Sequence, residues 1–220
     1  NGNLDPLFPG REPEPTYESL KETSRIVVSL NADFGIAHDG DGDRAIFIDD
    51  RGRVIWGDRS AVILAKHLME KYPGLPRKIY TAVSSSTIIE DYLREYNVEV
   101  VWLKVGSVDI ARAMLMNGDA LCGFEENGGF MFPKHQYVRD GGLALALMLE
   151  TLADWNMKLS DIYDTLPKMY AIKTKIPLDR SKVQVILGKV SNMFSGYRQV
   201  NIDGVKVIGE DFWVLVRPSG

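Results

Sequence analysis

The sequence lacks the features of a disulfide-bonded, membrane-spanning or nucleic-acid-binding protein. It has one cysteine, Cys122, which cannot form an internal disulfide and which we expect to be a small buried residue in a reducing, cytoplasmic setting. Its most apolar run, 141–149, is far shorter than the ~20 residues needed to cross a bilayer. Lysine and arginine number 26 against 30 acidic residues, a net charge of −4, with no basic block to follow a nucleic-acid backbone. We therefore expect neither a membrane nor a nucleic acid as a partner.

The two ends of the sequence also lack the features of complete termini. The first residues contain no initiator methionine, and no charged start followed by a long apolar core that would indicate a signal peptide. The last residues, WVLVRPSG, stop at a Ser-Gly pair of the kind that opens a turn. The sequence therefore predicts a piece of a longer protein.

Hydrophobic residues make up 45% of the chain, which is ample for a packed core. Their spacing predicts helices over 17–30, 58–72, 86–96, 108–116, 141–153 and 181–194, and strands over 34–37, 45–48, 78–83, 99–103, 120–124, 169–176, 197–202, 205–208 and 212–216. The alternation of strands and helices over 57–155 predicts an α/β domain with a parallel sheet. Close-set strands around a single helix then predict a small antiparallel α+β domain, with the boundary near 160–168. The serines at 84–86 are expected to cap the helix that follows.

Three aspartates stand at alternate positions in the segment HDGDGDR, residues 38–44. In an extended segment, every second side chain points to the same side, so Asp39, Asp41 and Asp43 can converge. Carboxylates so close together repel one another unless a cation neutralises the group. Hard oxygen ligands in this number favour Mg²⁺ or Ca²⁺. The segment therefore predicts a site for a hard divalent cation at the tip of a strand-loop-strand unit.

The closest alternative for this segment is a calcium loop of the EF-hand kind. Such a loop requires glycine in its sixth position and glutamate in its twelfth, whereas counting from Asp39 gives Arg44 and Asp50, and the flanks are expected to be strands. The calcium loop is therefore rejected, which leaves a magnesium site or a solvated acidic turn without a ligand. Arg44 itself suits either a salt bridge to one of the aspartates or a bidentate grip on a phosphate.

A second polar loop, in the segment CGFEENGGFMF at 122–132, follows directly on a predicted strand. Ligands of parallel α/β sheets bind beyond the carboxyl ends of the strands, which is where Glu125 and Asn127 would stand. A carboxylate and an amide could hydrogen-bond neighbouring sugar hydroxyls. The alternative is a plain hairpin turn with exposed acids.

Two further segments suit anions. KVGS, at 104–107, lies between a predicted strand and a predicted helix, so backbone N–H groups and Lys104 could meet an anion there. RPSG ends the chain, and its Arg217 and Ser219 could bind phosphate. Taken alone, each of these segments also has the composition of an ordinary loop.

Taken together and in this order, the segments resemble those of the α-D-phosphohexomutase family, which includes phosphomannomutases and phosphoglucomutases, in a form closest to its archaeal members. DGDGDR resembles the family's metal loop, KVGS its third-domain loop, EENGG its sugar-recognition loop, RPSG the opening of its fourth-domain phosphate loop, and FPGREPEPT the lead-in to the metal loop. The resemblance implies parallel-sheet phosphoglucomutase-type α/β domains followed by a truncated, small antiparallel α+β domain. It implies that 1–55 is the C-terminal part of domain two with the metal loop, 56–160 a complete sugar-binding domain three, and 161–220 part of a phosphate-binding domain four.

The resemblance also implies roles for individual residues. Asp39, Asp41 and Asp43 would bind Mg²⁺, Arg44 would lie beside the phosphoryl transfer, Lys104, Gly106, Glu125 and Asn127 would contact substrate, and Arg217, Ser219 and Gly220 would begin the phosphate site. Gly129 stands where bacterial relatives carry histidine, and Ser107 where relatives often carry histidine or aspartate.

The activity that the resemblance implies is the Mg²⁺-dependent interconversion of hexose 1-phosphate and hexose 6-phosphate, with mannose or glucose as the sugar, through a phosphoserine and a hexose 1,6-bisphosphate. The family's phosphoserine lies in a Ser-His-Asn motif, and no Ser-His pair occurs in these 220 residues, so we predict that this chain alone is inactive. One alternative is a phosphoglucosamine mutase, and another is a non-catalytic, metal-dependent sugar-phosphate binding module. Expected partners are the hexose phosphate and bisphosphate, and a homo-oligomer remains open.

Overall fold

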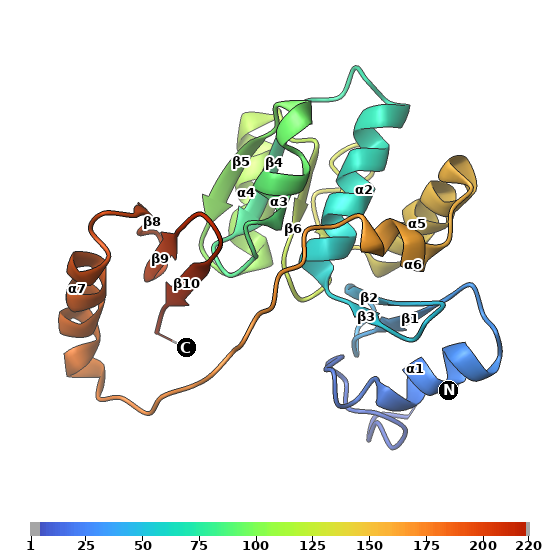
Figure 1. The fold of residues 1–220 in the computed structure, drawn as a ribbon, viewed down its shortest axis with the longest axis horizontal. Coiled ribbons are helices and arrows are strands. Elements are labelled where there is room, and N and C mark those ends of the chain that lie inside the picture. The colour runs from blue at the N-terminus through green and yellow to red at the C-terminus, as the bar shows by residue number, and fades with distance from the viewer. Residues whose placement is uncertain (1–4, 219–220) are drawn as a thin grey trace.

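A central four-stranded sheet is formed by the largely buried runs 78–82, 122–124 and 130–131 and the partly buried run 99–103 in the computed structural model, which describes residues 5–218 (Figure 1). Its order is β5 (Glu99–Leu103), β4 (Lys78–Ala82), β6 (Cys122–Phe124) and β7 (Phe130–Met131). The first three strands are parallel, and β7 turns back antiparallel to β6. The predicted parallel α/β domain is therefore confirmed.

Helices cover both faces of this sheet, because successive side chains of each strand point to opposite sides. The helices of this region are α2 (Gly57–Lys71), α3 (Ile88–Tyr92), α4 (Ser107–Asn117), α5 (Gly141–Trp155) and α6 (Leu159–Asp164), with a 3-10 turn η1 (Arg94–Tyr96) after α3. Ile79 of β4 packs into the core that contains α2, α3 and α5, whereas Tyr80 packs with α4 on the other face. The first of these cores continues through α6 to Leu166. Of the helices in residues 5–218, none is both long and apolar enough to cross a membrane.

The N-terminal part is an antiparallel sheet flanked by α1 (Lys21–Ser29) and packed on α2 and α5. Its strands are β1 (Phe34–His38), β2 (Ala45–Asp49) and β3 (Val54–Ile55). His38 pairs with Ala45, so the intervening loop 39–44 is the tip of the hairpin, as predicted. Every residue of β2 is buried, which anchors one side of that loop in the protein interior.

The C-terminal part is a three-stranded antiparallel sheet with one long helix, which confirms the predicted α+β unit. It contains η2 (Arg180–Lys182), α7 (Val183–Met193), β8 (Arg198–Val200), β9 (Val205–Ile208) and β10 (Trp213–Val216). Figure 1 shows this unit on the far side of the central sheet from β1–β3, with residues 167–179 running between them.

Two local predictions are wrong. The expected strand 169–176 is an extended connection that pairs with no strand of residues 5–218, and Tyr170 and Ile172 are 92% and 94% exposed on it. The serines at 84–86 do not cap α3, since its N-cap Thr87 makes no side-chain cap bond, and Ser84 Oγ instead donates to Glu126 Oε2 at 2.7 Å. Tertiary partners, rather than local capping, decide the conformation of both segments.

The C-terminal unit docks on β5 and on the segment before α3 through a buried amine. Lys206 on β9 is fully buried, and its Nζ lies 3.6 Å from the ring centre of Trp102 and 4.9 Å from that of Trp213. The same amine donates to the carbonyl of Ser85. Burial lowers the pKa of Lys206 to about 7, although the nearby carboxylate of Glu90 opposes this shift.

Raising the pH above 7 is expected to stabilise this docking. In the unfolded chain Lys206 has an ordinary pKa of about 10.4, so above pH 7 the unfolded state binds the extra proton and the free energy of unfolding rises with pH. Below pH 7 Lys206 is protonated in both the folded and the unfolded state, so it no longer makes the free energy of unfolding depend on pH. Between pH 7 and 9 we expect the free energy of unfolding to rise by about 1 kcal/mol per pH unit, measured by urea unfolding followed by tryptophan fluorescence.

Lys206→Met is the matched control for this prediction, because it retains the buried stem without the titrating amine. The wild-type slope should exceed that of the variant over the same pH range. Equal slopes would contradict a depressed pKa.

Candidate functional site

The loop 39–44 brings its three aspartates together at the tip of the β1–β2 hairpin. Asp39, Asp41 and Asp43 each offer a carboxylate oxygen, and these oxygens all lie within 4.8 Å of one another. Gly42 adopts a φ of +76°, a conformation that favours glycine, and its N–H donates to the carbonyl of Asp39 at 3.2 Å. The convergence that the alternate spacing predicts is therefore present.

The donor set of this cluster fits a hard divalent cation. Its ligand atoms are all carboxylate oxygens, which Mg²⁺ prefers. Asp43 Oδ1 is buried and has no hydrogen-bond partner in the described part of the chain. Burial raises the pKa of the Asp43 carboxyl, Arg139 opposes that shift, and the charges of Asp39 and Asp41 add to it. A solvated acidic turn would not enclose a carboxylate oxygen that accepts no hydrogen bond. Arg44 Nε is 4.0 Å from Asp43 Oδ1, and a bound cation would satisfy this oxygen directly.

Arg44 lies against the cluster in a salt bridge. Its Nε is 2.8 Å from Asp39 Oδ2, and its Nη1 is 2.9 Å from Glu14 Oε1 in the N-terminal lead-in. Its main chain is held as well, since Arg44 N donates to Asp39 Oδ1 at 3.1 Å and its carbonyl accepts from His38 Nδ1 at 2.8 Å. The salt bridge is one of the two roles expected for Arg44, and the grip on a phosphate stays a prediction.

The loop 125–129 connects β6 to β7 as a tight turn. Gly128 has a φ of +98°, and Glu125 N donates to the carbonyl of Gly129 at 2.9 Å. The alternative of a hairpin with exposed acids is thus half right, because the turn is a hairpin but the side chain of Glu125 is only 4% exposed. Asn127 is partly buried, and its Oδ1 accepts from Gly129 N at 3.2 Å.

Glu125 and Glu126 are adjacent in sequence but differ in their electrostatics. Burial raises the pKa of Glu125, with Arg139 opposing it. Burial acts in the same sense on Glu126, but Lys173 and Ser84 lower its pKa below the ordinary value. Lys173 Nζ, from the connection 167–179, lies 3.0 Å from Glu126 Oε1. The turn therefore carries one carboxyl whose pKa is raised and one whose pKa is lowered.

The loop 39–44 and the loop 125–129 are in direct contact. Ala45 N donates to the carbonyl of Gly128 at 3.0 Å, and Arg44 forms a β-bridge with Gly129. Arg139, just before α5, spans the same junction, with Nη2 2.6 Å from Asp43 Oδ2 and Nη1 3.1 Å from Glu125 Oε2. Sequence analysis missed Arg139, because its only local signal is a position one residue before the helix cap Asp140.

The remaining predicted residues form a second group, at the carboxyl end of β5. Lys104 is exposed there, and Gly106, with a φ of +138°, is the N-cap of α4. Val105 N donates to Asp203 Oδ2 at 3.3 Å, and the same oxygen is 3.1 Å from Arg217 Nε. One carboxylate thus joins the 104–107 loop to the start of the RPSG segment. Ser219 and Gly220 lie outside the described residues.

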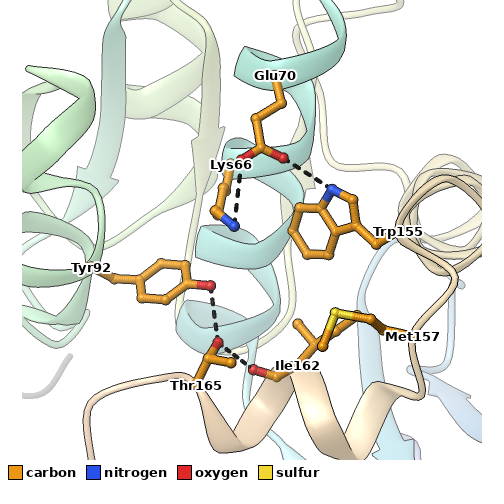
Figure 2. A pocket seen from close by; sticks show the side chains of 7 residues that line it. All are labelled: Lys66, Glu70, Tyr92, Trp155, Met157, Ile162 and Thr165. Carbon is orange, nitrogen blue, oxygen red and sulfur yellow. Dashed lines mark hydrogen bonds and ion pairs between the residues drawn. The ribbon is translucent and has the colours of Figure 1, made fainter.

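A pocket elsewhere on the molecule contains none of these residues. Figure 2 shows Lys66 and Glu70 of α2 facing Trp155, with Tyr92 opposite Thr165. Trp155 Nε1 donates to Glu70 Oε2 at 3.0 Å, and the Tyr92 hydroxyl is 3.1 Å from Thr165 Oγ1. These polar groups satisfy one another, so the pocket is a packed junction of helices.

Comparison with known protein families assigns most of the chain. Residues 56–170 match the family model described as phosphoglucomutase/phosphomannomutase, alpha/beta/alpha domain III. Residues 1–52 match the corresponding model of domain II. The loop 39–44 falls in the second match, and the 104–107 and 125–129 loops fall in the first.

Individual relatives agree with this assignment. The chain is 55% identical to a phosphoglucosamine/phosphogalactosamine mutase of Sulfurisphaera tokodaii, covering 100% of this chain and 49% of the relative. It is 40% identical to a phosphoglucomutase/phosphomannomutase of Thermococcus kodakarensis, over 100% of this chain and 48% of the relative. A crystal structure of a phosphoglucomutase/phosphomannomutase family protein from Burkholderia thailandensis superposes with a TM-score of 0.83 at 26% identity, covering 99% of this chain and 46% of that one. The chain thus spans about half the length of these relatives.

Proposed function

Because the chain belongs to the α-D-phosphohexomutase family of phosphoglucomutases and phosphomannomutases, we propose that it carries the metal site and part of the sugar-phosphate site of an Mg²⁺-dependent phosphohexomutase. Such an isomerase interconverts hexose 1-phosphate and hexose 6-phosphate. The observation that carries the proposal is the convergence of three aspartates, one with a buried oxygen that accepts no hydrogen bond, directly beside the loop of Glu125. Both the cation site and the sugar loop would then face one substrate.

We propose the domain division that the resemblance implied. Residues 1–55 would be the end of domain two, 56–160 domain three and 161–220 part of domain four. The two family matches, which meet between residues 52 and 56, support the first boundary. The second boundary stays a prediction, as do a cytoplasmic location and a homo-oligomer.

In this proposal the residues divide the work by charge. Asp39, Asp41 and Asp43 would hold Mg²⁺, which when bound supplies a fixed positive charge against the negative charge of the transferring phosphoryl group. Arg44 offers a planar guanidinium that matches phosphate oxygens.

The remaining proposed residues orient the substrate. Glu125 and Asn127 present acceptor oxygens to sugar hydroxyls, while Lys104 and Gly106 lie by the N-terminus of α4, where an anion is favoured. Arg217, with Ser219 and Gly220, would hold the phosphate that is not being transferred. The phosphoserine of the family mechanism would come from a part of the protein outside these 220 residues, so residues 1–220 alone should bind but not turn over.

Two sugar classes remain candidates. The relative at 55% identity is named for phosphoglucosamine and phosphogalactosamine, and this favours an amino sugar phosphate as substrate. The relative at 40% identity is named for glucose and mannose phosphates, the class that the sequence analysis placed first. Assay of the intact protein with glucosamine 6-phosphate, glucose 6-phosphate and mannose 6-phosphate in parallel would decide. Binding without any turnover of all three would instead favour a non-catalytic binding module.

Asp41→Asn is expected to weaken Mg²⁺ binding at least about tenfold, since a ligand charge is lost from an otherwise intact loop. Asp41 is exposed, so the amide should leave the fold unperturbed. Isothermal calorimetry with MgCl₂ measures the affinity, and circular dichroism checks the fold. Asp109→Asn, at a partly exposed aspartate on α4, is the control. Equal Mg²⁺ affinity of the Asp41 variant and the wild type would remove the metal assignment.

A further inference from the structure

Arg139 holds one carboxylate from each of two loops. Its side chain is 19% exposed, with Nη2 2.6 Å from Asp43 Oδ2 and Nη1 3.1 Å from Glu125 Oε2. A planar guanidinium can serve two carboxylates at once because its N–H groups diverge in a fixed fork. The contact therefore fixes the distance between a metal-loop carboxylate and a carboxylate of the 125–129 loop.

The backbone of Arg139 is anchored by its neighbour. Asp140 N donates to the carbonyl of Phe130 at 3.0 Å, which ties the segment to β7. Asp140 Oδ1 accepts from Leu143 N at 2.8 Å, which caps α5. The arginine thus extends from a fixed point and is not carried on a free loop.

Gly129 provides the space for the arginine stem. A Cβ built on Gly129 would lie 2.3 Å from Arg139 Cδ and 3.0 Å from its Cγ. The φ of Gly129 lies outside the left-handed region, so its backbone would accept another residue. The requirement for glycine here is therefore steric and comes from Arg139.

We infer that Arg139 is a positioning residue that couples the metal loop to the 125–129 loop, and that Gly129 is glycine in order to admit it. The inference rests on the proposed function. A guanidinium on Asp43 occupies one carboxylate oxygen and places a positive charge next to the cation site, which opposes Mg²⁺. The same guanidinium supplies the buried Glu125 with a counter-charge and a fixed position. Arg139 thus lowers the affinity for the metal while it orders the sugar loop.

Arg139→Met tests this coupling in the intact protein. Calorimetry with MgCl₂ is expected to show several-fold tighter binding, because the competing cation is gone. Binding of glucose 6-phosphate or glucosamine 6-phosphate, whichever the wild type binds more tightly, is expected to weaken about tenfold, as Glu125 loses a charged hydrogen bond. If Arg139 had a purely structural role, the substitution would weaken the binding of Mg²⁺ and of the sugar phosphate together. Arg139→Lys restores a cation without the fork and should fall between the two proteins for both ligands.

Gly129→Ala approaches the same contact from the other side. The added methyl would displace the arginine stem. This variant should therefore behave like Arg139→Met, with tighter binding of Mg²⁺ and weaker binding of the sugar phosphate. The double variant, with both Gly129→Ala and Arg139→Met, should bind the sugar phosphate no more weakly than either single variant, because the two substitutions remove the same contact. Gly142→Ala is the matched control, since its Cβ would meet only Asp140 Oδ1, at 3.4 Å.

The outcomes separate the inference from the proposed function. A wild-type protein that binds no Mg²⁺ overturns the proposed function and the inference with it. The inference alone is overturned if the wild type binds both Mg²⁺ and the sugar phosphate, while a folded Arg139→Met variant binds both with unchanged affinity or binds both more weakly. Additive losses in the double variant would overturn the role assigned to Gly129.

Discussion

Gly57→Ala is expected to destabilise the protein by about 3 kcal/mol, at the upper end of the usual cost of overpacking. Gly57 begins α2, and a Cβ there would lie 2.2 Å from Gly128 N and 2.8 Å from the carbonyl oxygen of Glu125. Both are backbone atoms, so no side chain can rotate away. The turn itself would have to move, and the hydrogen bond from Gly57 N to the carbonyl of Glu126, 3.0 Å long, would be strained.

Helix propensity predicts the opposite sign for this substitution. Alanine is favoured over glycine by about 1 kcal/mol in a helix interior and by less at its first position. The steric term should exceed this gain, because the obstacle is main chain on a buried turn. Urea unfolding measures the sum, and Gly74→Ala, where an added Cβ meets nothing within 4 Å, is the control. A stabilised Gly57 variant would show that the turn adapts without cost.

This substitution should also affect ligand binding through the same contact. The turn 125–129 carries Glu125 and Asn127, and the carbonyl of Gly128 accepts a hydrogen bond from Ala45 N in the hairpin that holds loop 39–44. Movement of the turn would therefore disturb both proposed sites at once. In this protein the close approach of two glycine-containing segments sets the geometry of the site.

Much of the fold could be predicted from sequence because its signals are local. The strand 99–103 and the strand 205–208 have the bounds that their apolar runs predict, and the hairpin around 39–44 follows from two short runs flanking polar residues. The bounds of these segments agree with their local pattern. Their burial does not follow it everywhere, since Lys206 in strand 205–208 is fully buried.

The errors occur where a neighbour decides. The segment 169–176 has β propensity but meets no sheet edge among the described residues, so it stays extended and exposed. Serine is a common helix-capping residue, yet the hydroxyl of Ser84 donates its hydrogen bond to Glu126 instead. Propensity alone could not identify either partner.

The candidate site divides in the same way. Asp39, Asp41 and Asp43 could be predicted because alternation in an extended segment already implies convergence. Arg139 could not be predicted, since it lies far from Asp43 in the chain. The fold brings it to Asp43 because the segment between β7 and α5 lies beside the loop 39–44. Side chains that join two loops leave no periodic signal in either loop.

Glu125→Gln is expected to lower kcat/KM of the intact protein about a hundredfold, the value of a strong charged hydrogen bond in a buried site. Glutamine retains the shape of the side chain but loses the charge that Arg139 holds at 3.1 Å. Only one oxygen would remain to accept from a sugar hydroxyl, and the amide nitrogen would face the guanidinium as a second donor. Affinity for Mg²⁺ should not weaken, because the three aspartates are untouched.

That separation between the two ligands makes the Glu125 variant informative. The control is Glu150→Gln on α5, where the carboxylate pairs with Lys71 of α2, and the kcat/KM of this variant should equal that of the wild type. Steady-state assays and calorimetry on the same preparations give both quantities. An active Glu125→Gln enzyme would place sugar recognition elsewhere, whereas an inactive one with normal Mg²⁺ binding would locate it at the buried carboxylate. The second result follows if burial beside Arg139 keeps Glu125 in place for a sugar hydroxyl, because an amide cannot reproduce that ion pair.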